Sequence, residues 1–190
     1  MTPMIQSILA ATDLSKSSLN AIDRGFQIAR LTQARYTVMH AAGLDALAPL
    51  RNLLGGVEAE NISRKILEQH KMMVESITSQ SERNGGVSAM VHVAQGLATD
   101  AVPAHASAID ADLLVIGAQG EGLLRRLTVG STASRLLRKS KRPVLVVKNP
   151  CESPYRKALI PIDFSAASDR SVGFARAVAP TASPNFEHLK

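Results

Sequence analysis

Short apolar runs alternate with longer amphipathic stretches along most of the chain. Between the runs, apolar residues recur at helical spacing, as Leu19, Ile22 and Phe26 do in the first stretch. Strands that alternate with helices predict an open, mostly parallel five-stranded α/β sheet with helices on both faces. The runs expected to form buried strands are 7–12, 36–42, 88–96, 112–117 and 144–148.

The expected helices have recognisable boundaries. Ser15 is placed to cap the first helix at its N-terminus. A long helix follows the loop that contains Gly55 and Gly56, and the pair Gly85-Gly86 is expected to end it. A shorter helix at 99–111 contains Pro103, which must lie in its first turn or bend it. A last helix is expected at 131–140.

The C-terminal tail repeats the start of the chain. Residues 157–179 follow the pattern of residues 6–30, with Asp163 in the place of Asp13. One strand and one helix cannot bury a core alone, so this unit is expected to dock on the first domain or on another chain. We expect a domain at 1–148, a linker at 149–156 and the first strand and helix of an incomplete second repeat at 157–190.

Composition narrows the class of protein. The 190 residues carry a net charge of +6, which suits an anionic partner. Aromatic residues make up only 3% and offer little for stacking on bases, so nucleic acid is an unlikely ligand. The single cysteine, Cys151, allows no intramolecular disulfide. No signal peptide or membrane span is evident in the sequence, and we expect a soluble cytoplasmic protein.

A glycine pattern follows the fourth expected strand. Gly117, Gly120, Gly130 and Ser131 are spaced as G-x-x-G-x9-G-S. The last pair opens a helix, where backbone N–H groups and the helix dipole attract anions. The hydroxyls of Ser131 and Thr132 can donate to phosphate oxygens, and one of them is expected to cap the helix. The alternative is that these residues form only a hinge between a strand and a helix.

Other phosphate motifs do not fit this stretch. Gly117 and Gly122 have the spacing of a Walker loop, but Leu123 replaces its lysine, and the dinucleotide fingerprint G-x-G-x-x-G is absent. No aromatic pair is placed to bind FMN. Arg125 and Arg126 either clamp a triphosphate or keep the loop soluble.

The histidines of the sequence show no metal-ligand spacing. His40 is expected to be a satisfied strand residue. Asp13 follows the first strand and either caps the next helix or faces the ligand. In a parallel sheet of this kind, the strand ends at Asp13, Ala41 and Gly117 are expected to converge.

These features together resemble the universal stress protein family, whose ATP-binding members carry the G-x-x-G-x9-G-[ST] pattern and an Asp after the first strand. The resemblance covers residues 1–148 and restarts near 157. It implies a Rossmann-like fold, similar to that of adenine nucleotide alpha hydrolases. Ala11 stands where many members have proline. The resemblance implies nucleotide contacts at Ala11, Thr12, Asp13, Ala41, Gly117, Gly120, Gly130, Ser131 and Thr132.

The function implied by the resemblance is binding of ATP with Mg²⁺ in stress response or regulation, with adenine nucleotide as the partner. It also implies a homodimer or tandem pairing through the strand at 144–148. No nucleophile or catalytic base stands out, so we expect no dedicated enzyme, and weak ATP hydrolysis is left open. A nucleotide-free dimerising module of the same fold is the alternative function.

Overall fold

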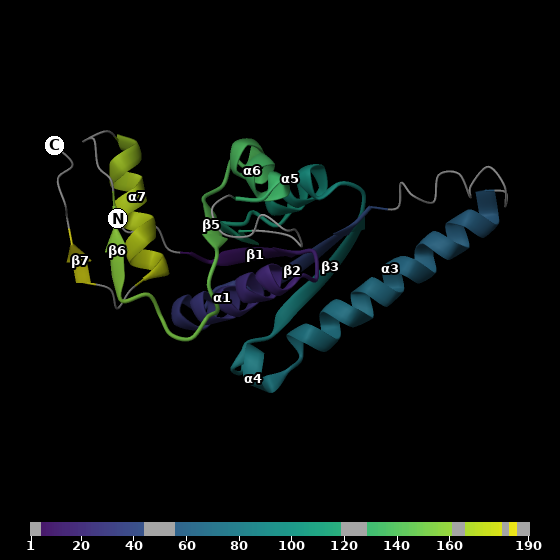
Figure 1. Ribbon diagram of the computed structural model, residues 1–190, viewed down its shortest axis with the longest axis horizontal. Coiled ribbons are helices and arrows are strands. Elements are labelled where there is room, and N and C mark those ends of the chain that lie inside the picture. Colours follow the sequence, from purple (N-terminus) through teal and green to yellow (C-terminus); the bar gives the residue numbers. More distant parts are fainter. Residues whose placement is uncertain (1–4, 44–55, 119–128, 161–165, 180–182, 186–190) are drawn as a thin grey trace.

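The computed structural model describes residues 5–43, 56–118, 129–160, 166–179 and 183–185. Helices and strands alternate along the chain, as the apolar pattern predicts (Figure 1). In chain order, the elements are β1 (Ser7–Thr12), α1 (Lys16–Thr32), β2 (Arg35–Ala42), α3 (Gly56–Thr78), α4 (Ser81–Asn84), β3 (Ala89–Gln95), α5 (Ala98–Ala108), β4 (Leu113–Gly117), α6 (Ser131–Lys139), β5 (Val144–Val147), β6 (Lys157–Leu159), α7 (Ala166–Val178) and β7 (Ser183–Asn185).

The first five strands form one parallel sheet in the order β3-β2-β1-β4-β5. The central strand β1 pairs with strands on both sides, so that Ile8 lies between Tyr36 of β2 and Leu113 of β4. Strands buried on both faces need continuous apolar sequence, which explains why β1 and β4 read as unbroken apolar runs. The predicted open α/β sheet is therefore confirmed.

Alternate side chains of the central strands belong to two hydrophobic clusters, one on each face of the sheet. Ile8 and Val38 belong to a cluster with residues of α1 and α3, whereas Leu9 and Met39 belong to a cluster with residues of α5 and α6. Successive side chains of a strand point to opposite faces, so one run of sequence supplies both layers. Helices accordingly cover both faces of the sheet (Figure 1).

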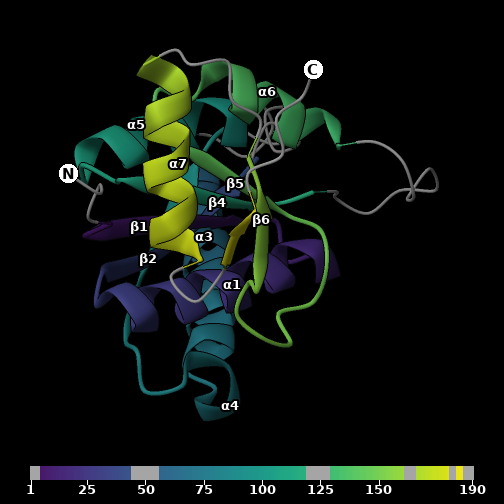
Figure 2. The same ribbon diagram turned by 90° about the vertical axis from the view of Figure 1, so that its left-hand side faces the viewer.

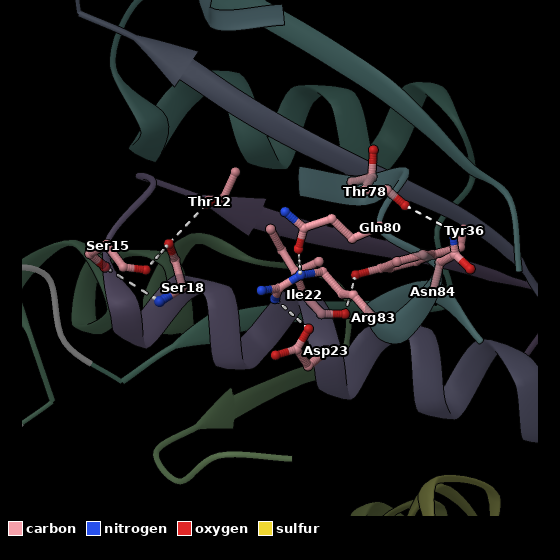
Figure 3. Close-up of polar contacts among 10 residues, drawn as sticks. All are labelled: Thr12, Ser15, Ser18, Ile22, Asp23, Tyr36, Thr78, Gln80, Arg83 and Asn84. Atoms are coloured by element: carbon pink, nitrogen blue, oxygen red, sulfur yellow. Dashed lines mark hydrogen bonds and ion pairs between the residues drawn. The ribbon is translucent and has the colours of Figure 1, made fainter. Parts of the chain in front are cut away.

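A close contact locks α1 onto the sheet. Tyr36 of β2 is 2% exposed, and its hydroxyl donates to the carbonyl oxygen of Ile22 at 2.9 Å (Figure 3). The ring also meets Phe26 edge to face, with centroids 4.7 Å apart. Gly25 leaves room for this ring, because any Cβ at that position would lie 2.6 Å from the Cζ atom of Tyr36.

The ends of two helices, α3 and α5, lie three or more residues before the predicted ends. The long helix α3 ends at Thr78 instead of continuing to Gly85, and the separate turn α4 reaches the left-handed Gly85. The Thr78 hydroxyl donates to the Val74 carbonyl, and the Ser79 hydroxyl donates to the Ser76 carbonyl. Such side-chain hydrogen bonds compete with the backbone hydrogen bonds that would continue the helix. In α5, which ends at residue 108 and not 111, Pro103 lies in the interior instead of the first turn.

The C-terminal tail packs against the first domain. After β6 and α7, a further short strand, β7, pairs in parallel with β6, so the tail has one strand more than the predicted strand and helix. Phe174, Ala177 and Val178 of α7 pack against the core cluster shared by α1 and β5. Figures 1 and 2 show the tail on the side of the sheet where β5 lies.

One side chain of α1 holds the linker. Arg24 is 5% exposed, and its Nη1 donates to the carbonyl oxygen of Ser153 at 2.8 Å and to the side chain of Gln27. Its guanidinium lies 4.0 Å from the centre of the Tyr155 ring. Among the residues that the structure describes, the buried Nε atom of Arg24 has no hydrogen-bond partner. None of the helices in the described ranges is long and apolar enough to cross a membrane.

Candidate functional site

The predicted site residues lie on neighbouring strands. Because β1 is flanked by β2 and β4 in a parallel sheet, the carboxyl ends of these three strands meet at one edge. Thr12 stands opposite His40, and Ala11 stands between Met39 and Ile116. The structure thus brings together the strand ends that carry Asp13, Ala41 and Gly117.

Hydroxyl groups shape the turn between β1 and α1. Ser15 is the N-cap of α1, as predicted, and its side chain accepts from the backbone N–H of Ser18 at 3.3 Å. The Ser18 hydroxyl donates to the Ser15 carbonyl at 2.9 Å, so at 2.8 Å it accepts from the Thr12 hydroxyl (Figure 3). Leu14 has a positive φ of 66° and donates its N–H to Thr12 Oγ1. The Thr12 side chain is therefore committed to this turn.

Asp13 projects from the same turn and is exposed. Its carboxylate accepts from the backbone N–H of Ser15 at 3.0 Å, whereas Ser15 provides the helix cap. Partial burial raises the pKa of Asp13, but the hydroxyls of Ser15 and Ser18 and the Ser15 N–H outweigh it and hold the pKa below its ordinary value. Asp13 is thus ionised at neutral pH and can accept hydrogen bonds from a ligand.

Gly117 ends β4 against the first turn of α1. A Cβ at this position would lie 2.8 Å from the backbone carbon and oxygen of Ser17, a distance that real side chains do not tolerate. The glycine is therefore required for the close approach of β4 to α1. This packing requirement is independent of any ligand.

Gly130 starts the helix α6 directly beside the end of β4. Its N–H donates to the carbonyl oxygen of Ala118 at 2.8 Å, and Ala118 donates to Val147 of β5. Gly130 is the N-cap of α6 and offers no side chain to cap it, so the expected hydroxyl cap from Ser131 or Thr132 is wrong. Both hydroxyls are instead on exposed residues of the first turn.

Part of the predicted loop lies outside the described residues. This applies to Gly120, Arg125 and Arg126. The described ends of the loop, Gly117-Ala118 and Gly130, are nevertheless fixed by the hydrogen bond between them.

His40 adds a contact that spacing along the sequence does not reveal. Its Nδ1 lies 2.8 Å from the carbonyl oxygen of Thr12, and its Nε2 lies 3.1 Å from Nδ1 of His70 on α3. Burial lowers the pKa of His40, and the positive charge that His70 can carry lowers it further, against the opposing effects of Thr12 and Asp13. His40 is a satisfied strand residue, as predicted, but His70 was missed because only the fold places it there.

The comparisons with known proteins point to one family. The sequence profile of the universal stress protein family matches residues 4–148. Universal stress protein MJ0531 of Methanocaldococcus jannaschii is 27% identical over 147 residues, which make up 77% of this chain and 84% of that protein.

Solved structures of universal stress proteins share the fold. One, in complex with cAMP, is 25% identical with a TM-score of 0.50, and the alignment covers 77% of this chain and 98% of that chain. Another, from Archaeoglobus fulgidus, is 19% identical with a TM-score of 0.68, and it covers 97% of this chain and 67% of its own. The second alignment therefore extends into the C-terminal tail.

Proposed function

The chain belongs to the universal stress protein family, and on this premise we propose that it binds ATP with Mg²⁺ at the carboxyl ends of β1, β2 and β4. The observation that carries the proposal is the hydrogen bond between Ala118 and Gly130, which sets the N-terminus of α6, with a glycine as its N-cap, beside the end of β4. Backbone N–H groups at such a helix start, with the exposed hydroxyls of Ser131 and Thr132, suit a phosphate chain. The related structure in complex with cAMP supports an adenine nucleotide as the ligand.

Charge orients the nucleotide within this site. The ionised carboxylate of Asp13 repels phosphates and accepts hydrogen bonds from hydroxyl groups, so it faces the ribose. The positive end of the α6 dipole attracts the phosphates. Main-chain groups at Ala11 and Ala41 then contact the adenine. Thr12 contributes indirectly, because its side chain stabilises the turn between β1 and α1. We assign the protein a regulatory role in stress response.

The proposal extends to how domains associate. Among the described residues, β5 pairs only with β4, so its other edge is open to a strand from a second domain or a second copy. The sequence repeat and the alignment that reaches into the tail support the division into a domain at 1–148, a linker at 149–156 and the start of a second repeat at 157–190. The single cysteine fits a reducing compartment such as the cytoplasm.

Replacing Gly130 tests the nucleotide site. Its φ of −58° is accessible to any residue, so Gly130→Leu adds bulk at the helix start without backbone strain. Calorimetric titration of the tag-free full chain with ATP and Mg²⁺ should show affinity reduced by more than about tenfold, since close backbone approach to phosphate depends on glycine. The thermal midpoint should change little.

The matched control for this test is Arg138→Leu, which adds an apolar side chain at the other end of α6 and should leave affinity unchanged. Gly117 is unsuitable, because a side chain there would meet the backbone of Ser17 and affect folding. Unchanged affinity in Gly130→Leu would contradict the phosphate assignment. The whole proposal fails if the wild-type chain binds none of ATP, ADP, AMP and cAMP at millimolar concentration.

A further inference from the structure

Four histidines of the described residues form two pairs, one on each face of the sheet. His40 of β2 meets His70 of α3, while His92 of β3 meets His105 of α5. In the second pair, the rings are parallel within 3° with centroids 3.9 Å apart. The in-plane lone pairs of stacked rings run side by side and cannot converge on one atom. In the first pair, the rings are inclined by 80°.

The His40 ring is oriented from the backbone. Its Nδ1–H donates to the Thr12 carbonyl at 2.8 Å, which fixes the neutral tautomer with an unprotonated Nε2. Metal-binding histidines are held in the same way, with the second ring nitrogen donating to a carbonyl or carboxylate. The Nε2 lone pair of His40 is therefore directed toward His70.

The distances within this pair fit two rings that converge on one point better than a collinear hydrogen bond. For a head-on hydrogen bond at the observed nitrogen separation of 3.1 Å, the ring centres would be about 5.4 Å apart, taking about 1.15 Å from ring centre to nitrogen. For two rings pointing at one ion about 2.05 Å from each nitrogen, the ring centres would be about 4.8 Å apart. The observed separation of the centroids is 4.8 Å.

We propose that His40 Nε2 and His70 Nδ1 bind one divalent first-row transition ion, such as Zn²⁺, between β2 and α3. Imidazole nitrogen suits zinc, copper and nickel ions, whereas Mg²⁺ and Ca²⁺ prefer oxygen. To bind, His70 takes the tautomer with its proton on Nε2 and remains neutral. No third His, Cys, Asp or Glu of the described segments joins the pair, so water completes the coordination. Such a site is distinct from the Mg²⁺ expected with a nucleotide.

Zinc titration of the tag-free full chain without nucleotide tests the proposal. We expect one Zn²⁺ per chain to bind through this pair, and His70→Gln to weaken that binding by more than about tenfold because one of two protein ligands is lost. His70 is the better position to vary, since it is half-buried whereas His40 is 7% exposed. The matched control is His105→Gln in the stacked pair, which should bind Zn²⁺ like the wild type.

Nuclear magnetic resonance of the ring nitrogens gives a second measurement that does not depend on a variant. On addition of Zn²⁺, His40 Nε2 and His70 Nδ1 should shift to metal-bound positions, while His92 and His105 stay unchanged. Zinc affinity that is equal in wild type and His70→Gln would overturn the proposal. Absence of any shift at the His40 and His70 nitrogens would also overturn it. Both readouts are independent of nucleotide binding.

Discussion

At the scale of single residues, Gly25 and Gly117 show how a missing side chain sets the spacing between layers. Each glycine allows an element to approach another more closely than any Cβ would permit. Gly25 admits the Tyr36 ring from β2, and Gly117 admits the backbone at Ser17. Both contacts involve α1, so this helix packs closely against the sheet at two points where glycine leaves the necessary space.

Substitution of Gly25 by alanine is expected to destabilise the fold. Alanine favours helix over glycine by about 1 kcal/mol, but overpacking a buried ring costs about 1–3 kcal/mol. Because the nearest atoms belong to the ring of the fully buried Tyr36, we expect a net loss of about 1 kcal/mol in the free energy of unfolding, measured by urea denaturation.

Two comparisons make this measurement specific. Gly43→Ala places a methyl group where no atom lies within 4 Å, and it should leave stability nearly unchanged. In a Tyr36→Leu background, the cost of Gly25→Ala should fall, because the ring that it meets is gone. A cost that is the same in both backgrounds would show that the ring is not the cause.

For single residues, the sequence predicted the place of a residue within a helix or strand better than the interactions that its side chain makes. The pattern predicted Ser15 as a helix cap and placed Gly117 at a strand end, since capping and strand termination are local properties. It predicted a hydroxyl cap for α6, where Gly130 is the cap, because the exact first residue of a helix depends on the chain that precedes it. His70 could not be predicted as a neighbour of His40, since their contact exists only after folding.

At the scale of elements, the second histidine pair joins the edge strand β3 to α5. The Nε2 of His105 is buried and has no hydrogen-bond partner within the described part of the chain, and its ring stacks on His92. Burial lowers the pKa of His105, and the charge that His92 can carry lowers it further. The pair therefore favours the neutral form in the folded state.

Stability should decline in acid because of this pair. His105 has a folded pKa below the value of about 6.5 in an unfolded chain, so its contribution to stability is complete above pH 6.5 and is lost as the pH falls toward the folded pKa. Denaturation at pH 7.5 and pH 5.5 should show a smaller loss of stability in His105→Gln than in the wild type. An equal loss in both proteins would rule out His105 as a source of the acid sensitivity.

Element type was easier to predict than element ends. All five predicted strands of the sheet and the helices between them are present, because their apolar periodicity is strong. The break between α3 and α4 was missed, since Thr78 and Ser79 stop the helix through side-chain hydrogen bonds that periodicity does not encode. Pro103 lies inside α5, where no N–H reaches the carbonyl four residues before it.

At the scale of the whole molecule, the tail and the first domain are joined by polar and apolar contacts. Arg24 holds the linker through Ser153 and Tyr155, and Phe174 of α7 packs against the core. The sequence repeat predicted that the tail would need a surface to dock on. It did not predict Arg24 as the contact, because a buried arginine is rare and leaves no pattern along the chain.

Removing the Arg24 contacts should loosen the linker. In Arg24→Met, the hydrogen bond to Ser153 and the stacking on Tyr155 are lost, so amide hydrogen exchange between residues 150 and 160 should become several-fold faster. Lys16→Met, at an exposed position in the first turn of the same helix, is the matched control and should exchange like the wild type. Equal exchange in the two variants would show that Arg24 does not hold the linker.

The hydrogen bond between Ala118 and Gly130 has a consequence for how proteins of this kind diversify. This bond holds the two ends of the intervening segment close together, and the entropy of closing that segment depends only weakly on its length. Insertions, deletions or grafted sequences between these two residues should therefore leave β4 and α6 in place. Changes in this segment, by evolution or by design, could therefore alter ligand specificity while the fold of the rest of the chain stays the same.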